Sequence, residues 1–408
     1  MVPQRLAFFH PTLRNFGGAE LLLVAQAQHM RSVGHDVCVV TDALERSRWD
    51  GLLDDLAIQL VEPRTFADIL KELGPEARMR LRGERAVRSM QDRDIVVAMN
   101  FPCNAQLGSS DLAAKKVWYC NEPPREHHFV EANPRLCRHL ARTPKPRTRL
   151  EEVYAERLSI YRRRIERQKR VYRERQFDIA ATRRLDRIIA ISAFTRDNAT
   201  RAYGVRAETV VPPIVRFPEP GRARTGIDRS RPSILVHTRL EYLKNVEVIL
   251  SSFAAFRRRH PSALLHIVGE GSARKDLKAL ARRLDVSQAT RFHGFLSRAE
   301  LSAVYDACDV FALLPIDEPF GMVFPEAAAR GLLVIGPDHG GPLEILDGGN
   351  LGWLCDPFSE ESVVDALERA FALSDAEANE RRAAADAACR HRYSQSVAGP
   401  QLERAIVG

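Results

Sequence analysis

The stretch "DVFALLPIDEPFGMVFPEAAARGLLVIGP", residues 309–337, contains a strand, a loop, a helix and a second strand in succession. Residues 309–315 form a continuous apolar run typical of a buried parallel strand. Residues 327–331 are typical of a helix, and residues 332–337 form a second apolar run. Two parallel strands joined by a helix make a βαβ unit, so this stretch predicts an α/β fold.

Pro325 limits where the helix of this unit begins. Proline is tolerated in the first helical turn, where its missing N–H would have no partner, so the helix cannot begin much before Met322. The backbone N–H groups of residues 321–324 would then point off the end of the helix. Such groups, with the positive end of the helix dipole behind them, predict an anion site.

Two carboxylates, Glu318 and Glu326, lie on either side of this predicted anion site. A carboxylate accepts two O–H bonds from a diol, so the pair would suit a diphosphate with a sugar on one side and a ribose on the other. The alternative is a charge near a helix N-terminus and a second charge on a solvated helix face. These nine residues alone leave both interpretations open.

The chain of 408 residues is long enough for two domains, and its composition is that of a globular protein, with 45% hydrophobic and 28% charged residues. No apolar run approaches the roughly 18 residues that a membrane span needs, and the first apolar run is too short for a signal peptide. Seven scattered cysteines, without CxxC spacing, predict buried thiols in a reducing compartment. We therefore expect a cytoplasmic protein.

The net charge of +8 is concentrated in one region. Residues 135–187 hold 18 lysines and arginines against 7 acids, a local charge of +11 that leaves −3 for the rest of the chain. This basic region could associate weakly with an anionic partner, such as the inner face of a membrane, a lipid phosphate or a polyanion. The alternative is a solvated helix with i,i+4 ion pairs. Specific nucleic-acid binding is not expected.

Strand and helix patterns alternate twice along the chain, which predicts two doubly wound domains. The Pro-, Gly- and Arg-rich segment between them reads as a linker. The expected organisation is an N-terminal Rossmann-like domain with a basic helical insertion, a linker, a C-terminal Rossmann-like domain and a tail that returns to the first domain. The N-terminal domain would span residues 1–212, with the insertion at about 135–180, and the linker residues 213–231. The C-terminal domain would span residues 232–390, and the tail residues 391–408.

Four loops at the ends of predicted strands carry residues suited to phosphate binding. They are "NFGGAE" (15–20) with Gly17 and Gly18, "HTRLEYLKN" (237–245) with Arg239 and Lys244, "IVGEGS" (267–272) with Gly269 and Gly271, and "GPDHGGPLEIL" (336–346). Glycines let a backbone approach a ligand closely, and the two cations suit a diphosphate. Each loop alone could be an ordinary turn or surface charge. Together they would gather at the carboxyl edges of two sheets, where open α/β sheets bind ligands.

With these motifs in their order, the chain resembles the retaining glycosyltransferases of family four. The resemblance covers most of the chain and is carried by "GGAE", "DRIIAISAFTRDNATRAYG" with "VVPPIV", "TRLEYLKN", "IVGEGS", "FHGFLS" and, above all, "EPFGMVFPEAAARG" with "GGPLEIL". It implies the GT-B fold, an α/β architecture of two Rossmann-like, doubly wound domains facing across a cleft. It also implies that the N-terminal domain lies on the acceptor side and that the C-terminal domain binds the nucleotide sugar.

The resemblance also implies roles for individual residues. Arg239 and Lys244 would hold the donor diphosphate and offset the charge that grows on the leaving nucleotide. Glu318 would contact the transferred sugar, and Glu326 the ribose. The backbone of Phe320, Gly321, Met322 and Val323 would meet sugar and phosphate, and Gly17 and Gly18 would lie against the diphosphate. Reaction in this family is usually drawn as front-face attack, so no protein nucleophile is assigned.

One loop departs from the family pattern. Family members often carry a histidine near the sugar, and here the corresponding loop is "VWYCNEPPREHH", residues 117–128. Asn121 stands at the histidine's place, with Glu122 next to it and His127 and His128 further on. Asn121, Glu122 or His127 would therefore contact the sugar or the acceptor.

No metal and no other cofactor is expected, because the one Asp-x-Asp, residues 92–94, precedes a strand and no His/Cys cluster has ligand spacing. The donor could be GDP-mannose or a UDP-hexose, and the acceptor a glycan, a lipid-linked molecule or a small molecule. Two alternatives remain. One is a GT-B sugar-nucleotide epimerase, and the other is a non-catalytic protein that binds polyanions or membrane surfaces.

Overall fold

The computed structural model describes residues 2–14, 17–49, 51–61, 75–143, 145–167, 169–218 and 226–408. The chain forms two compact units, each with its own parallel sheet. Residues 1–133, 158–216 and 393–408 make the first unit, and residues 134–157 and 217–392 make the second. Both are α/β units, as the alternating sequence pattern predicts.

The first unit contains a seven-stranded parallel sheet in the order β3-β2-β1-β4-β5-β6-β7. Its strands are β1 (Arg5–His10), β2 (Asp36–Thr41), β3 (Ala57–Leu60), β4 (Ile95–Ala98), β5 (Lys115–Cys120), β6 (Arg187–Ala190) and β7 (Thr209–Val210). The strand order reverses between β1 and β4, so the carboxyl ends of these two strands form the switch point where such sheets bind ligands.

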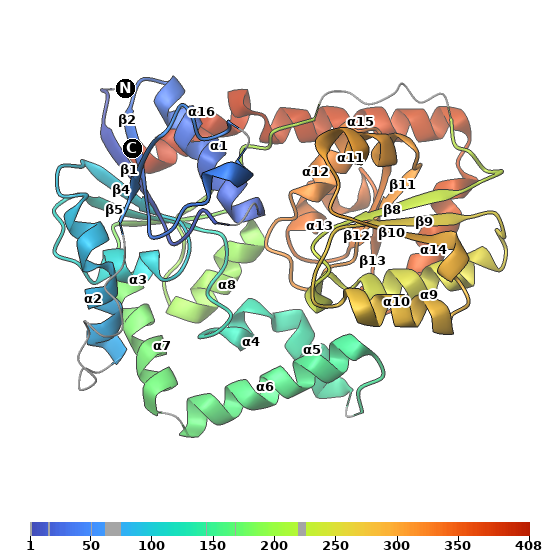
Figure 1. The fold of residues 1–408 in the computed structure, drawn as a ribbon, viewed down its shortest axis with the longest axis horizontal. Helices are drawn as coiled ribbons and strands as arrows, with labels where there is room; N and C mark the ends of the chain where they lie inside the picture. Colours follow the sequence, from blue (N-terminus) through green and yellow to red (C-terminus); the bar gives the residue numbers. More distant parts are fainter. Residues whose placement is uncertain are drawn as a thin grey trace. The chain divides into compact units, whose positions relative to one another are not determined.

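Helices cover both faces of this first sheet, as Figure 1 shows. On one face lie α1 (Gly18–Ser32) and α16 (Gln395–Val407), and on the other lie α2 (Pro75–Arg88), α3 (Cys103–Gly108), α7 (Lys169–Thr182) and α8 (Ala193–Tyr203). Short elements complete the unit: η1 (Arg46–Arg48) and α4 (Phe129–Ala132). Trp118 and Tyr203 meet edge to face at 5.4 Å in the core between the sheet and these helices.

The second unit contains a six-stranded parallel sheet in the order β10-β9-β8-β11-β12-β13. Its strands are β8 (Ser233–His237), β9 (Leu264–Val268), β10 (Thr290–Gly294), β11 (Val310–Ala312), β12 (Leu333–Pro337) and β13 (Trp353–Cys355). The reversal of strand order falls between β8 and β11. Candidate residues of three predicted loops follow β8, β9 and β11, so they share one sheet edge.

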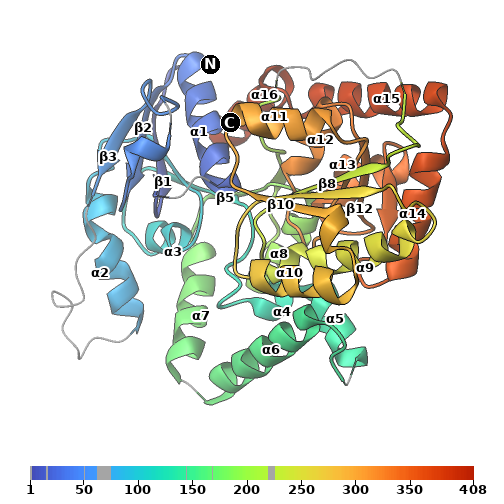
Figure 2. The ribbon, with the colours of Figure 1, turned by 45° about the vertical axis from the view of Figure 1, so that its right-hand side comes forward.

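Helices again cover both faces of the second sheet (Figures 1 and 2). One face carries α9 (Val246–Arg257), α10 (Arg274–Arg283) and α14 (Glu360–Ala372), and the other carries α11 (Arg298–Asp306), α12 (Val323–Ala329) and α15 (Asp375–Tyr393). Short elements complete the unit: η2 (Tyr242–Lys244), η3 (Ser287–Ala289), α13 (Gly341–Ile345) and η4 (Asp347–Gly349).

The basic insertion is divided between the two units, which corrects its expected placement in the N-terminal domain alone. It contains α5 (Pro134–Arg142), α6 (Arg149–Arg167) and α7. Residues 134–157, which include α5 and the start of α6, belong to the second unit, and the remainder belongs to the first. Contacts between distant parts of the sequence decide this division, so the local charge pattern could not predict it.

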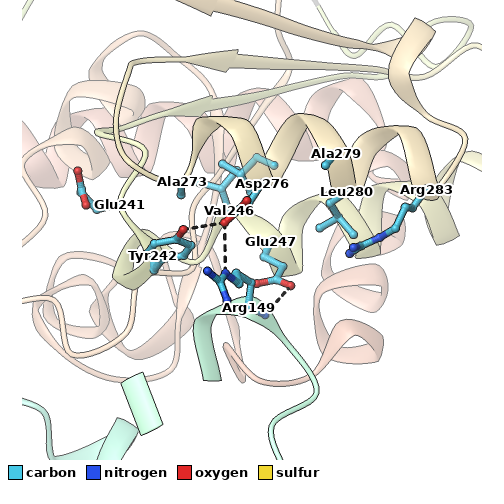
Figure 3. A pocket seen from close by; sticks show the side chains of 11 residues that line it. Arg149, Glu241, Tyr242, Val246, Glu247, Ala273, Asp276, Ala279, Leu280 and Arg283 are labelled. Carbon is cyan, nitrogen blue, oxygen red and sulfur yellow. Dashed lines mark hydrogen bonds and ion pairs between the residues drawn. The ribbon is translucent and has the colours of Figure 1, made fainter. Parts of the chain in front are cut away.

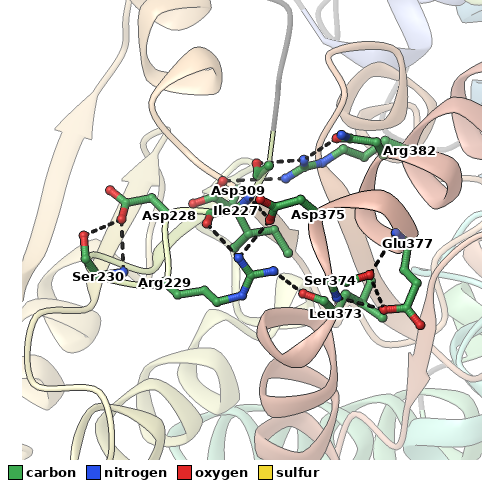
Figure 4. A network of polar contacts seen from close by, with 12 residues as sticks. Ile227, Asp228, Arg229, Ser230, Asp309, Leu373, Ser374, Asp375, Glu377 and Arg382 are labelled. Atoms are coloured by element: carbon green, nitrogen blue, oxygen red, sulfur yellow. Dashed lines mark hydrogen bonds and ion pairs between the residues drawn. The ribbon is translucent and has the colours of Figure 1, made fainter.

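The end of the predicted linker is fixed to the second unit (Figure 4). The Asp375 carboxylate accepts hydrogen bonds from the Ile227 amide at 3.2 Å and from Arg229 at 2.8 Å. Arg382, which is buried, donates to the Gly226 carbonyl at 3.0 Å and lies 3.6 Å from Asp309. Residues 226–231 are thus part of the second unit, whereas residues 219–225 lie outside the described chain.

Phe324 should contribute strongly to the stability of the second unit. Its side chain is fully buried and meets Phe311 edge to face at 5.5 Å. Phe324→Ala is expected to cost about 3–5 kcal/mol of unfolding free energy, and Phe324→Leu distinctly less, because a Phe-to-Ala change in a core leaves a cavity. Urea denaturation measures both, and an Ala variant within about 1 kcal/mol of wild type would contradict the packing described.

Candidate functional site

The candidate site lies at the carboxyl edge of the second sheet, where close backbone contacts hold neighbouring loops together. Gly269 has a φ of +125°, and a Cβ there would lie 1.9 Å from the Thr238 carbonyl oxygen. At Gly271 a Cβ would lie 2.5 Å from the Leu240 oxygen. Both predicted glycines therefore allow the loop after β9 to pack directly against the loop that carries Arg239.

Lys244 and Glu318 form the central ion pair of the site. Lys244 ends η2, and its Nζ lies 2.6 Å from an oxygen of Glu318 in the loop after β11. A backbone bond of 2.9 Å from the Ile316 amide to the Leu243 carbonyl joins the same two loops. Arg239 lies on the same loop as Lys244 and is exposed. Its guanidinium has no partner among the residues that the structure describes. The structure thus brings Lys244 and Glu318 together and leaves Arg239 available to a ligand.

The loop after Glu318 presents backbone amides. Met322 is the N-cap of α12, so the helix begins at Val323, as Pro325 predicts. Within the described ranges, the amides of Gly321, Met322 and Val323 donate no hydrogen bond, whereas the amide of Phe324 donates to the Gly321 carbonyl at 3.0 Å. The expectation of four free amides is therefore wrong for Phe324. Three amides remain for an anion.

Glycines also shape this loop. Gly321 has a φ of +94°, where only glycine is unstrained. The Gly341 amide donates to the Glu318 carbonyl at 2.9 Å, and a Cβ at Gly341 would lie 2.3 Å from the Cα of Phe320. Phe320 itself is buried, so it can offer a ligand its backbone rather than its ring. The "GGP" of residues 340–342 thus fixes the path of the Glu318 loop.

Glu326 lies in the first turn of α12, half-buried and without a hydrogen-bond partner in the described part of the chain. Burial raises the pKa of Glu326 to about 7, and the nearby Arg330 guanidinium opposes that shift. A partly desolvated carboxylate without donors is suited to accept O–H bonds from a ligand. This fits the ribose contact that the family resemblance implies.

In the first unit, Gly17 and Gly18 begin α1, just after β1. Gly17 is the N-cap in an extended conformation, and its carbonyl accepts the Leu21 amide at 3.0 Å. A Cβ at Gly17 would lie 2.6 Å from the Glu20 carboxylate. The two glycines therefore open a helix at the switch-point edge of the first sheet, and their contact with a diphosphate stays a prediction. Residues 15 and 16 of the same loop lie outside the described chain.

Asn121 also lies at the edge of the first sheet, in a hydrogen-bonded row across three strands. Its Nδ2 donates to the Asn100 Oδ1 at 2.8 Å, and the Asn100 amide lies 3.2 Å from the His10 Nε2. Burial lowers the pKa of His10 to about 4, so this imidazole is neutral at physiological pH. The sequence analysis did not single out His10, the last residue of β1, or Asn100, which lies two residues after β4.

The other candidates of this loop have partners of their own. Glu122 pairs with Arg125 at 2.8 Å. His127 is buried, its ring meets Phe101 edge to face at 4.8 Å, and burial lowers its pKa. His128 is fully buried and lies 3.0 Å from the Asp178 carboxylate. These environments favour structural roles for both histidines, so Asn121 is the stronger candidate.

Phe295 is a further candidate that the sequence analysis did not single out. It directly follows β10 and is 83% exposed, an unusual position for a large aromatic ring at a ligand-binding edge. The Gly294 carbonyl before it accepts the Gly269 amide at 2.9 Å, so Phe295 continues the same row of loops. The sequence signal that could have identified Phe295 is an aromatic residue directly after a predicted strand, in "FHGFLS".

A separate cavity of about 110 Å³ lies in the second unit between α9, α10, η2 and the start of α6 (Figure 3). Its polar side chains bond to one another. The Tyr242 hydroxyl donates to Asp276 at 2.7 Å, and Arg149 lies 3.3 Å from the same carboxylate. The cavity is therefore a docking region for α6 rather than the predicted donor site.

In the described ranges, no three His, Cys, Asp or Glu side chains gather in a way that could hold a metal ion. No described helix is long and apolar enough to cross a bilayer. All seven cysteines are free thiols, and six of them are buried.

Comparisons with known proteins agree with this geometry. Residues 219–389 match the family model described as glycosyl transferases group 1. A glycogen synthase of Mycobacterium tuberculosis is 35% identical over 216 residues, covering 50% of this chain and 49% of the relative. A GDP-mannose-dependent alpha-(1-6)-phosphatidylinositol monomannoside mannosyltransferase of the same organism is 31% identical over 198 residues, covering 45% and 51%. The chain thus spans about half the length of the curated relatives it matches.

Solved structures show the fold of the whole chain. The crystal structure of HepE from Anabaena in complex with UDP and glucose superposes with a TM-score of 0.74 at 16% identity, covering 99% of both chains. The chain therefore has the GT-B fold. Its second unit contains residues 219–389, which match the glycosyl transferases group 1 family model. The predicted fold is confirmed, and the match of the second unit agrees with the predicted family.

Glu326 should make the stability of the protein depend on pH. Because its pKa is about 7 in the folded chain against 4.5 for an ordinary glutamate, folding favours the protonated form. Its stabilising contribution is present below about pH 4.5 and is lost as pH rises through about 7. As the pH rises from 5 to 8, the unfolding free energy of Glu326→Gln should therefore increase by up to about 3 kcal/mol relative to that of wild type. Urea denaturation at the two pH values measures this difference.

Glu361, which is exposed on α14, provides the matched control. Glu361→Gln should leave the pH profile as in wild type. A Glu326→Gln variant whose stability relative to wild type is the same at both pH values would contradict the described environment of Glu326.

Proposed function

We propose that this chain is a retaining glycosyltransferase that moves a hexosyl group from a nucleoside diphosphate sugar to an acceptor hydroxyl. The observation that carries the proposal is the Lys244–Glu318 pair at 2.6 Å, beside three amides without partners and the half-buried Glu326. The match to the family model and the names of the relatives support a sugar-nucleotide donor.

Each group has a part in binding the donor. Lys244 has three N–H donors, of which Glu318 takes one, so two remain for phosphate oxygens. Arg239 and the amides of Gly321, Met322 and Val323 supply further donors to the diphosphate. Glu326 accepts the ribose hydroxyls, and Phe295 provides a face for the nucleobase. Gly269 and Gly271 act by keeping the loops in place.

In the transfer step, the bond between the sugar C1 and the leaving phosphate oxygen breaks while a bond from C1 to the acceptor oxygen forms on the same face. The acceptor proton passes to the leaving phosphate, which leaves as the nucleoside diphosphate. Charge grows on that diphosphate, and Lys244 and Arg239 stabilise it. Glu318 orients Lys244 and the sugar hydroxyls. We propose no metal and no other cofactor, and Asn121 is the proposed polar contact from the first unit.

Substitution of the central pair tests this proposal. Lys244→Ala and Glu318→Ala are each expected to lower acceptor-dependent release of UDP or GDP from UDP-hexoses or GDP-mannose at least about 100-fold, because transition-state stabilisation is lost. The assay follows released nucleotide and the anomeric configuration of the product. Arg259→Ala, which removes an exposed pair with Glu368 at 3.1 Å, is the matched control and should retain full activity.

Full activity in both Ala variants would refute the site assignment. Inversion of the free sugar nucleotide without consumption of an acceptor would instead indicate an epimerase. Inverted product configuration would refute the retaining course.

A second proposed property is association with an anionic membrane surface, at the inner face of the membrane, by a protein that we place in the cytoplasm. Four exposed cations of residues 134–148 have no ion-pair partner among the described residues: Arg138, Arg142, Lys145 and Arg147. Such cations are attracted to anionic lipids by about 1 kcal/mol each near the surface.

Replacing these four cations by glutamine should lower binding to phosphatidylglycerol vesicles at least about tenfold at low salt, measured by co-sedimentation. Arg258→Gln with Arg259→Gln, on exposed positions directly after α9, should have little effect. Equal binding to phosphatidylcholine vesicles, or binding that 1 M salt does not weaken, would contradict an electrostatic surface contact.

A further inference from the structure

Residues 134–157, which we call the brace, belong to the second unit although the sequence places them within the first half of the chain. The brace consists of α5, the start of α6 and the residues between them, of which residue 144 lies outside the description. It contacts the second unit at two places. One place adjoins Glu318 in the sequence, and the other lies three residues after Lys244.

The first contact is made by Asp317, the residue before Glu318. Asp317 is fully buried and has a φ of +53°, which is uncommon for a residue with a side chain. Its carboxylate accepts the backbone amides of Arg135 at 3.1 Å and Leu136 at 3.0 Å. Asp317 therefore caps the N-terminus of α5, so its backbone position depends on the brace.

Side chains of the brace strengthen this first contact. The Arg135 guanidinium lies 3.0 Å from Asp338 and 3.1 Å from Asp356, acids that follow β12 and β13. The His139 ring stacks on Phe358 with their centroids 3.6 Å apart. These contacts spread the attachment of α5 over the ends of two neighbouring strands.

The second contact is made by Glu247, three residues after Lys244. Its two carboxylate oxygens accept the backbone amides of Arg149 at 3.1 Å and Leu150 at 3.2 Å, which begin α6. Arg149 also reaches Asp276, the carboxylate that holds the Tyr242 hydroxyl, as Figure 3 shows. Tyr242 and Glu247 thus tie both sides of Lys244 to the brace.

The brace is also held together internally. Glu151, in α6, accepts the Arg147 amide at 2.6 Å and lies 2.7 Å from the His139 ring in α5, so it links the two helices and Arg147. A segment that is attached near each partner of an ion pair can help to set the distance between the partners.

We propose that the brace positions Lys244 and Glu318 for the reaction, and that Asp317 and Glu247 are positioning residues. This inference rests on the proposed glycosyl transfer. Loss of the Asp317 contact with α5, or of the Glu247 contact with α6, lets one loop shift relative to the other. Lys244 and Glu318 are then misplaced and stabilise the transition state less well. Nucleotide binding, which also uses Glu326 and the amides of α12, is affected much less.

The test uses the full chain with Glu247→Gln and Arg135→Ala, and with Glu368→Gln as a control carboxylate of the same unit outside the brace. The two brace variants should lower kcat about tenfold, with the KM for the donor and the Kd for UDP or GDP within about twofold of wild type. Glu368→Gln should keep the wild-type kcat. Asp317→Asn changes the carboxylate that caps α5 and therefore tests the first contact most directly. If Asp317→Asn does not fold, Arg135→Ala tests the same attachment of α5.

A readout that does not need activity accompanies these rates. Hydrogen exchange of the Ile316 and Asp317 amides, which donate to the Leu243 carbonyl and to His339, should become at least about tenfold faster in Glu247→Gln than in Glu368→Gln, because a distant brace contact restrains that loop. Unchanged exchange there, or a lowered melting temperature with unchanged kcat, would overturn the positioning role. A wild-type chain that transfers no sugar but shows the exchange effect would refute the proposed function and leave the brace supported.

Discussion

The ion pair between Lys244 and Glu318, at 2.6 Å, is the interaction on which the candidate site depends. It joins the loop after β8 to the loop after β11, which are the two strands at the switch point of the second sheet. Both side chains are largely shielded from water, with side-chain exposures of 23% and 15%. Ion pairs of this kind add little net stability, because desolvation offsets much of the attraction, but they do fix geometry. We therefore attribute the pair to function rather than to folding.

The loops around this pair are held by backbone contacts that only glycine permits. Gly269 and Gly271 let the loop after β9 touch the loop that carries Arg239. Gly341 lets the segment after β12 touch the loop that carries Glu318. The site is thus a set of loops that pack on one another before any ligand binds. Such preorganisation lets charged groups stabilise a transition state without a reorganisation cost at the moment of reaction. The brace adds a restraint from outside this row of loops.

The sequence predicted the fold well because buried parallel strands are continuous apolar runs with helices between them. Short elements such as α3, α4 and β13 have too few residues to show a period, so a hydrophobic pattern does not predict them. Glu318, Glu326, Arg239 and Lys244 were predicted because they lie in local motifs at strand ends. Asp317 was not, because its partner Arg135 lies 182 residues earlier and no local pattern marks that contact. The same reason explains the unexpected division of the basic insertion.

The most direct measurement is a crystal structure of the chain with bound UDP or GDP. The account predicts the diphosphate within hydrogen-bond distance of Lys244 and of the amides of residues 321–323, with a ribose hydroxyl on Glu326. A nucleotide bound in the cavity beside Arg149, or a diphosphate that contacts neither Lys244 nor these amides, would contradict it.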